Sequence, residues 1–208
     1  MIVPVMEAGD FQSLIRARRT VRAYRPDAIP VDQLEAAVED ACWAPSPHDT
    51  QPWRFALITS ADGRRTLAEA MGERWREDLT ADDARATFID GQVKGSRVRL
   101  SRAQALVLVC FSPRDLDRYP DAERQAAERE MAVQSVGAAI QNLLLSLHLR
   151  GLGAAWMCAP LFCPGVVRQA LALPPDWEPQ ALVTVGVAAS QPPAPPRRPL
   201  DGALLRRV

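Results

Sequence analysis

Lysine is nearly absent from this chain of 208 residues, since Lys94 is the single lysine among 25 basic side chains and arginine supplies the others. Acidic residues also number 25, so the formal net charge is zero. Nucleic-acid-binding domains usually carry a basic excess, and we therefore expect no nucleic-acid partner. The two histidines, His48 and His148, are too few for a histidine-rich metal site, and we expect no metal.

The sequence also lacks a membrane-length apolar run and a framework of paired cysteines. Its longest apolar run, residues 105–111, has the length of a strand, whereas a membrane span needs about 20 residues. The first residues lack the basic and long apolar parts of a secretory signal. The four cysteines form no Cys-x-x-Cys pair, which favours reduced thiols in a cytoplasmic protein. We therefore expect no membrane partner and a cytoplasmic location.

Glycine is sparse, at 11 residues, and no nucleotide-binding loop is recognisable. No P-loop sequence occurs, and the close pair Gly151 and Gly153 comes before an expected strand rather than a helix. A classical dinucleotide fold is therefore disfavoured. A serine hydrolase is disfavoured as well, because no G-x-S-x-G elbow surrounds Ser46.

Helical and strand-like apolar spacing fills most of the chain. This spacing predicts an α+β fold in one domain over residues 1–208, with a central mixed sheet of about four to five strands wrapped by helices. Prolines predict an extended C-terminal arm over residues 189–208. The predicted helices are residues 32–43, 62–79, 121–150 and 164–173, and residues 80–100 are expected to be mostly helical. Asp32 is the expected cap of the first of these helices, and Leu67, Met71 and Trp75 are expected to point inward from the second. The predicted strands are residues 53–59, 105–111, 154–158 and 180–188.

The first predicted helix places arginine on an apolar face. At about 100° per residue, Leu14, Ile15 and Arg18 fall on the same side as Phe11, and Arg22 would join them if the helix continued. A buried guanidinium needs an anionic partner. The partner is either a carboxylate elsewhere in the chain or an anionic ligand, unless the side chains extend to the surface.

A rigid segment lies between a predicted helix and a predicted strand, at residues 44–55. It contains three prolines, Pro45, Pro47 and Pro52, and several short polar side chains. Such a segment offers backbone donors and acceptors that no helix or strand uses. It is either a stiff connecting loop or a binding segment for a polar heteroaromatic ligand.

Four short motifs together resemble the FMN-dependent nitroreductase family. Each motif is weak alone, but their order over residues 10–200 matches the family, which implies a nitroreductase-like fold. Asp49 stands where the family has an asparagine. The motifs are Arg18-Arg19-Thr20-Val21-Arg22, Ala44-Pro45-Ser46 through Gln51-Pro52-Trp53, Gly151-Leu152-Gly153-Ala154-Ala155-Trp156, and Arg197-Arg198-Pro199-Leu200.

A closer resemblance exists within that family. Four further segments are similar to the C-terminal nitroreductase-like domain of the bifunctional coenzyme F-420:L-glutamate ligase, here without the ligase domain. They are Ala44-Pro45-Ser46-Pro47-His48, Tyr119-Pro120-Asp121-Ala122, Leu161-Phe162-Cys163-Pro164 and Leu173-Pro174-Pro175-Asp176-Trp177.

The resemblance implies a homodimer with FMN at the subunit interface and residues of both chains around it. FMN phosphate carries nearly two negative charges, which arginine binds well. The implied contacts are Arg18, Thr20 and Arg22 to ribityl and phosphate oxygens, Arg197 and Arg198 to the phosphate, Gly153 and Ala154 to one ring face, and Pro45, Ser46 and Pro47 of the partner chain along the ring. Arg19 and Gln51 are further candidate cofactor-binding residues.

The implied activity is reduction of the dehydro form of the deazaflavin F-420 precursor, by hydride transfer from FMN N5. The flavin carries the chemistry, so no catalytic side chain is nominated. Coenzyme F-420 or NAD(P)H is expected as electron partner or substrate. Two alternatives stay open: a generic NAD(P)H-dependent nitro, quinone or enone reductase, and a flavin- or deazaflavin-binding protein without turnover.

A charged segment, residues 80–102, is a candidate cover for the open face of the flavin. Its cations would meet an anionic substrate, unless they belong to a solvated helix face. The candidate substrate residues are His48, Lys94, Arg97 and Arg99.

Overall fold

The centre of the fold is a four-stranded antiparallel sheet in the order β1-β2-β4-β3. The computed structural model describes residues 7–201 and residue 205. The strands are β1 (Trp53–Ile58), β2 (Ala105–Phe111), β3 (Gly153–Met157) and β4 (Glu178–Gly186).

Alternate residues of the two central strands supply two separate hydrophobic cores. Val107 and Val109 face one core, whereas Leu106 and Leu108 face the other. All seven residues of β2 are buried, which explains why its sequence is apolar without alternation.

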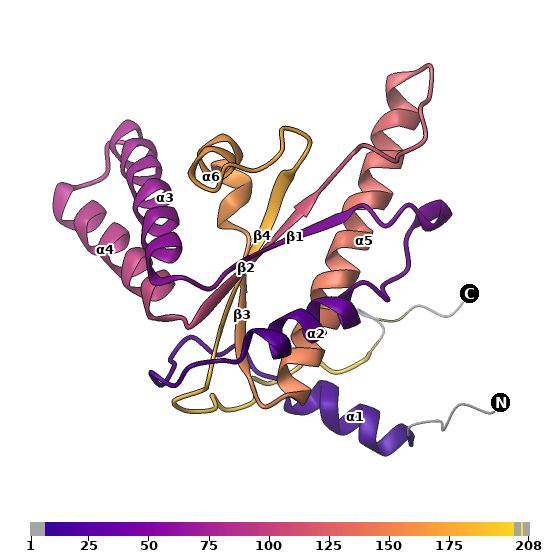
Figure 1. Ribbon diagram of the computed structural model, residues 1–208, viewed down its shortest axis with the longest axis horizontal. Helices are drawn as coiled ribbons and strands as arrows, with labels where there is room; N and C mark the ends of the chain where they lie inside the picture. The colour runs from indigo at the N-terminus through magenta and orange to yellow at the C-terminus, as the bar shows by residue number, and fades with distance from the viewer. Residues whose placement is uncertain (1–6, 202–204, 206–208) are drawn as a thin grey trace.

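Helices cover both faces of the sheet, as Figure 1 shows. Helices α2 and α5 pack together against one face, while the α3–α4 hairpin and α6 cover the other. The helices are α1 (Ala8–Ala17), α2 (Val31–Ala41), α3 (Ala61–Ala81), α4 (Ala86–Arg102), α5 (Ala122–Leu149) and α6 (Pro164–Ala170), with short 3₁₀ helices η1 (Pro47–Asp49) and η2 (Ala159–Phe162).

Helix ends follow the capping rules where the sequence provides a cap. The Ser60 side chain accepts a hydrogen bond from the Gly63 N–H at the start of α3, and Asp121 accepts one from Arg124 N–H at the start of α5. Gly151, with φ of +75°, follows the end of α5. The α+β class, the long helix over residues 121–150 and the strand over residues 105–111 are thereby confirmed.

Several local predictions were wrong. The sheet is antiparallel rather than mixed, and the parallel pairing is an isolated bridge from Thr20 to Ala154. Helix α2 begins at Val31 after Pro30, and Asp32 caps nothing. Trp75 is 37% exposed rather than turned inward.

Helix α1 differs most from its prediction. It ends at Ala17, so Arg18 is its C-terminal cap and Arg22 lies beyond it in an exposed, extended segment. No residue of α1, which the structure describes in full, is buried: Phe11 is 50% exposed and Ile15 is 40% exposed. The apolar face of α1 is therefore uncovered in a single chain.

Helix α5 is long and apolar enough to cross a bilayer by length and composition alone, with a mean hydropathy of 1.2 over its best window. Half of that window is buried inside the fold. Core helices of soluble proteins pass the same test, so this is weak support for a membrane span.

The segment after α1 runs along the edge of the sheet. The Val21 N–H donates to the Ala154 carbonyl over 2.9 Å, and the Arg25 N–H donates to the Val187 carbonyl over 2.8 Å. A Cβ on Gly153 would lie 2.8 Å from the Val21 side chain, so this close approach requires glycine.

Tyr24 fixes the far end of the same segment. Its hydroxyl donates to the Val21 carbonyl over 2.7 Å and lies 2.7 Å from Thr184 Oγ1. Burial raises the pKa of the Tyr24 phenol to about 12, so the hydroxyl remains a neutral donor. Together, Tyr24 and Gly153 fix where Arg18 and Thr20 lie.

Replacing Gly153 by alanine is expected to destabilise the fold by about 1–3 kcal/mol, because the added methyl group displaces Val21 from the edge of β3. Urea unfolding measures the change. The matched control is Gly165→Ala, since a Cβ at Gly165 in α6 meets nothing within 4 Å. An unfolding midpoint for Gly153→Ala equal to that of the control would contradict the close-approach argument.

Candidate functional site

Two arginines and a histidine gather where α1 ends beside the C-terminal end of α5. The Arg19 guanidinium donates to the carbonyls of Arg16 and Arg18, and Arg18 is half-buried. Burial lowers the pKa of His148 on α5, and the positive charges of Arg18 and Arg19 lower it further. The charges of both guanidinium groups therefore act on this imidazole.

We call Arg18 and Arg19, together with the imidazole of His148 beside them, the cationic cluster, whose positive charge is that of the two arginines. Among residues 7–201 and 205, no carboxylate forms an ion pair with Arg18, Arg19 or Arg22. The carboxylate partner considered from the sequence is therefore not present there. An anion such as the phosphate of FMN fits a cluster of this kind, because guanidinium binds phosphate bidentately.

Small residues adjoin the cationic cluster along strand β3. Thr20 bridges to Ala154, and both Gly153 and Ala154 are buried beneath the segment that follows α1. The structure thus brings Thr20 and Val21 next to Ala154 and Gly153, and Arg18 and Arg19 precede them on the same segment.

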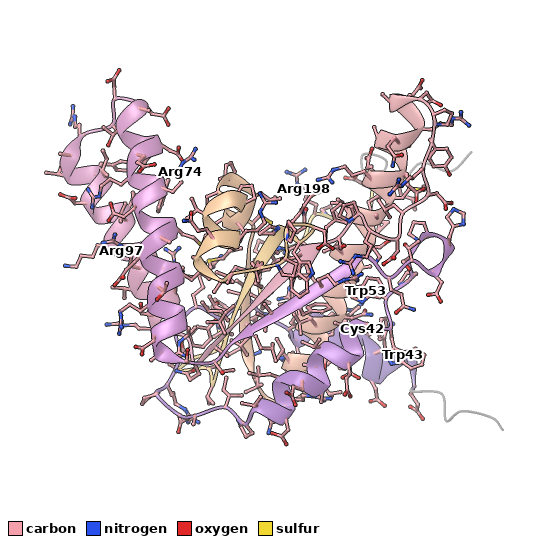
Figure 2. All side chains as sticks on the ribbon, turned by 45° about the horizontal axis from the view of Figure 1, so that its top comes forward. Cys42, Trp43, Trp53, Arg74, Arg97 and Arg198 are labelled. Atoms are coloured by element: carbon pink, nitrogen blue, oxygen red, sulfur yellow. The ribbon has the colours of Figure 1, made fainter. Side chains whose placement is uncertain are left out.

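The C-terminal arm passes the same end of α1. The Gln191 side chain donates to the Ala17 carbonyl over 3.0 Å, one residue from Arg18. Beyond it, residues 191–200 have no helix or strand, and Arg197 and Arg198 are exposed (Figure 2 labels Arg198). Residues 202–204 and 206–208 of the predicted arm lie outside the described residues.

The proline-rich segment is held in an unusual backbone conformation. His48, Asp49 and Gln51 have φ values of +51°, +54° and +46°, in a region that side chains usually avoid. The Ser46 hydroxyl accepts a hydrogen bond from the Gln51 N–H over 3.0 Å, and the Gln51 side chain donates to Asp49 over 3.1 Å. Such strain often marks binding loops, because it is retained only where surrounding contacts impose it.

Within one chain this segment does not meet the cationic cluster. Figure 1 shows η1 beside the middle of α5, whereas α1 lies at the C-terminal end of α5. Pro45, Ser46 and Pro47 therefore do not join Arg18 unless a second chain supplies them.

A cavity of about 600 Å³ opens beside the proline-rich segment. Asp49 and Gln51 line it together with Trp53 and Trp177, and Cys42 adds a thiol whose pKa burial raises. Figure 2 shows Cys42, Trp43 and Trp53 grouped where α2 leads into β1. We call this space the loop cavity.

The candidate substrate cations do not act as one group. Arg97 is paired with Glu73 and packs over Gly72, so it serves the α3–α4 hairpin instead. Lys94 is exposed on α4, and Arg99 lines a different cavity beside β3. His48 Nε2 lies 3.8 Å from Asp117 Oδ2.

Sequence reasoning missed His148, Asp117 and Trp177. None belongs to a motif around the flavin, and only the packing of α5 against α1, or of distant loops, brings them to the candidate sites. Trp177 belongs to one of the four segments that carry the closer resemblance, but its place beside Asp49 depends on the tertiary fold. Within the described ranges, no group of three or more His, Cys, Asp or Glu side chains is placed to hold a metal ion.

Comparison with known proteins agrees with this architecture. A family model described as "Nitroreductase family" matches residues 15–187. The NADH dehydrogenase of Thermus thermophilus is 32% identical over 217 residues, covering 99% of this chain and 98% of that protein. The 5,6-dimethylbenzimidazole synthase of Rhodospirillum rubrum is 28% identical over 188 residues, covering 88% of this chain and 84% of that protein.

Solved structures show the same fold. A BluB-like flavoprotein from Clostridium difficile 630 superimposes with a TM-score of 0.81 at 21% identity, covering 98% of this chain and all of that one. A nitroreductase from Desulfovibrio desulfuricans in complex with FMN gives a TM-score of 0.72 at 25% identity, covering 98% of this chain and 99% of that one. Because the family match spans most of the residues, the chain belongs to the nitroreductase family of FMN-dependent oxidoreductases.

Proposed function

We propose that this oxidoreductase holds FMN between two copies of the chain, with the phosphate on the cationic cluster. The observation that carries the proposal is the group of Arg18, Arg19 and His148 without a carboxylate partner among residues 7–201 and 205. A phosphate there would restore charge balance at a half-buried site.

Different residues of this chain would then hold different parts of the cofactor. Arg18 and Arg19 bind the phosphate, joined by Arg197 and Arg198 of the arm that Gln191 ties to α1. Thr20 and Arg22 orient the ribityl oxygens, and the backbone of β3 at Gly153 and Ala154 lies along one face of the ring. Bound FMN supplies hydride transfer at N5, so the protein needs to position and shield reactants more than to donate protons.

The second copy supplies the strained segment. Pro45, Ser46, Pro47 and Gln51 of the partner subunit would lie along the ring, which a single chain does not allow. The exposed Phe11 and Ile15 of α1 support this homodimer, because an apolar helix face left in water favours association.

For the substrate, we propose reduction of the dehydro form of the deazaflavin F-420 precursor. One of the segments that carry the closer resemblance reaches the loop cavity, since Trp177 lines it together with Asp49. The resemblance of these segments is what supports the deazaflavin substrate.

A generic NAD(P)H-dependent nitro, quinone or enone reductase is the second candidate. The names of relatives, including the NADH dehydrogenase of Thermus thermophilus, favour it equally. Membership of an enzyme family argues against the third reading, a flavin-binding protein without turnover.

A single-turnover experiment separates the two substrates. The purified flavoprotein is reduced anaerobically with NADH, and reoxidation of its flavin is followed at 450 nm after either dehydro precursor or a nitroaromatic is added. Fast reoxidation by the precursor supports the deazaflavin proposal. Reoxidation by the nitroaromatic alone supports the generic reductase, and a chain that never binds FMN refutes both.

Arg18→Ala is expected to weaken FMN binding at least tenfold, because one charge-assisted contact to phosphate contributes about 1.5–3 kcal/mol. Quenching of flavin fluorescence measures the affinity. Arg25→Ala is the matched control, since Arg25 lies on the same segment but pairs with Asp27 over 2.9 Å. Equal affinities for the two variants would refute the phosphate role of Arg18.

The titration of His148 gives a second test of whether the FMN phosphate binds beside Arg18 and Arg19. Because burial and two guanidinium groups lower its pKa, the free energy of unfolding is expected to fall as the pH drops through the unfolded-state value of about 6.5. Bound FMN phosphate opposes the guanidinium charges and should raise the pKa of His148. Proton NMR resolves the two imidazoles, with His48→Gln for assignment, and a His148 titration insensitive to FMN would contradict the site.

A further inference from the structure

Strand β1 lies at the edge of the sheet, so the carbonyls along its outer side have no neighbouring strand to bind. The chain enters this strand through Pro52. The Pro52 carbonyl is satisfied inside the sheet, because it accepts a hydrogen bond from the Ser112 N–H over 2.8 Å. The carbonyls on either side of it, at Gln51 and Trp53, need donors from elsewhere.

The Arg54 side chain supplies the donors for both carbonyls. Its Nη1 donates to the Gln51 carbonyl over 2.9 Å and to the Trp53 carbonyl over 2.8 Å. Its Nη2 donates to Asp115 Oδ2 over 3.1 Å, which ties the guanidinium to the loop between β2 and α5. Arg54 therefore takes the place of a neighbouring strand at this edge, because a planar guanidinium presents several donors in a fixed geometry.

The loop that carries Asp115 is itself held by α5. Gln125 of this helix accepts a hydrogen bond from the Tyr119 N–H over 3.1 Å and donates to the Asp117 carbonyl over 3.3 Å. The Asp117 carboxylate also lies 3.8 Å from His48 Nε2. The loop between β2 and α5 is thus a fixed support beside the strained backbone.

We call residues 46–51, which contain that strained backbone, the strained turn. Gln51 has a φ of +46°, and two bonds within the turn run from its N–H to Ser46 Oγ and from the Thr50 N–H to the Pro47 carbonyl. A strained backbone persists only where its surroundings impose it. In the part of the chain that the structure describes, the bond from Arg54 is the one hydrogen bond that reaches the backbone of the turn from outside.

We propose that Arg54 is a positioning residue, which holds the strained turn in the shape that it presents to the flavin of a second copy. This inference rests on the proposed function, in which Ser46, Pro47 and Gln51 of the partner subunit lie along the ring. Because its donors are engaged by two carbonyls and by Asp115, Arg54 acts on the flavin through the turn. A turn that is held in advance lowers the cost of ordering it when the flavin binds.

Amide hydrogen exchange of the full chain without flavin, read by peptide mass spectrometry, tests whether Arg54 holds the turn. In Arg54→Gln we expect the amides of residues 49–51 to exchange about tenfold faster, because the turn opens once its outside bond is lost. The matched control is Arg65→Gln, since Arg65 pairs with Asp62 over 3.0 Å on the exposed side of α3. Asp115→Asn should change the exchange by less than about threefold, because both carbonyl bonds remain.

Flavin titration tests whether the turn acts on the ring. Contacts to the ring are common to FMN and riboflavin, whereas only FMN carries the phosphate. Arg54→Gln should therefore weaken binding of both flavins by the same factor, about fivefold or more. The preference for FMN over riboflavin, which the proposed function assigns to Arg18, should remain as in the natural chain.

Unchanged exchange in Arg54→Gln would overturn the inference and leave the proposed FMN site untouched. Faster exchange with unchanged affinity for both flavins would also overturn it. So would a loss of affinity confined to FMN, because Arg54 would then contact the phosphate itself. A chain that binds neither flavin would instead refute the proposed function, and the exchange result would still decide whether Arg54 holds the turn.

Discussion

The close approach of residues 18–25 to the edge of the sheet is the constraint on which the candidate cofactor site depends. Gly153 lacks a side chain where Val21 packs, the Val21 N–H bonds to the Ala154 carbonyl, and the Tyr24 hydroxyl is buried against Thr184. With the segment fixed in this way, the end of α1 lies against α5, and Arg18 comes close to His148. The close contact at Gly153 thus fixes the segment that carries the positive charge of Arg18.

The net charge of zero conceals how the charge is distributed. Basic residues outnumber acidic ones by two over residues 1–30 and by three over residues 191–208, so the middle of the chain is acidic. The Gln191 contact to Ala17 brings the beginning of the arm to the end of α1. Inside the acidic middle, most guanidinium groups have carboxylate partners, as in the pairs Arg76–Asp90 and Arg129–Glu178.

The sequence predicted well those helices and strands in which buried apolar residues recur at a regular spacing. The strand over residues 105–111 and the helix over residues 121–150 were found almost to the residue, because unbroken apolar spacing defines them. The burial of the apolar face of α1 was predicted wrongly. Periodicity places Phe11 and Ile15 on one face of the helix, but it does not show whether their own chain or a second chain covers that face. The pairing of Arg97 with Glu73 escaped prediction for a related reason: it depends on the register of α3 against α4.

The candidate site was partly predictable for the same reasons. Motifs placed Thr20 and Ala154 on the list of cofactor residues, and the sheet edge joins them. His148 carried no sequence signal, because its place beside Arg18 arises from helices that meet only in the tertiary fold. The strained backbone at His48 and Asp49 was likewise invisible, since both residue types are also common in ordinary loops.

The central claim is that the cationic cluster binds the phosphate of FMN. The direct test compares the dissociation constants of FMN and riboflavin, which differ only by that phosphate, in the natural chain and in Arg18→Ala. The account predicts that the natural chain binds FMN at least a hundredfold more tightly, as two charge-assisted contacts of about 1.5 kcal/mol each would give, and that Arg18→Ala loses at least tenfold of this preference. Equal affinity for FMN and riboflavin in the natural chain would contradict it.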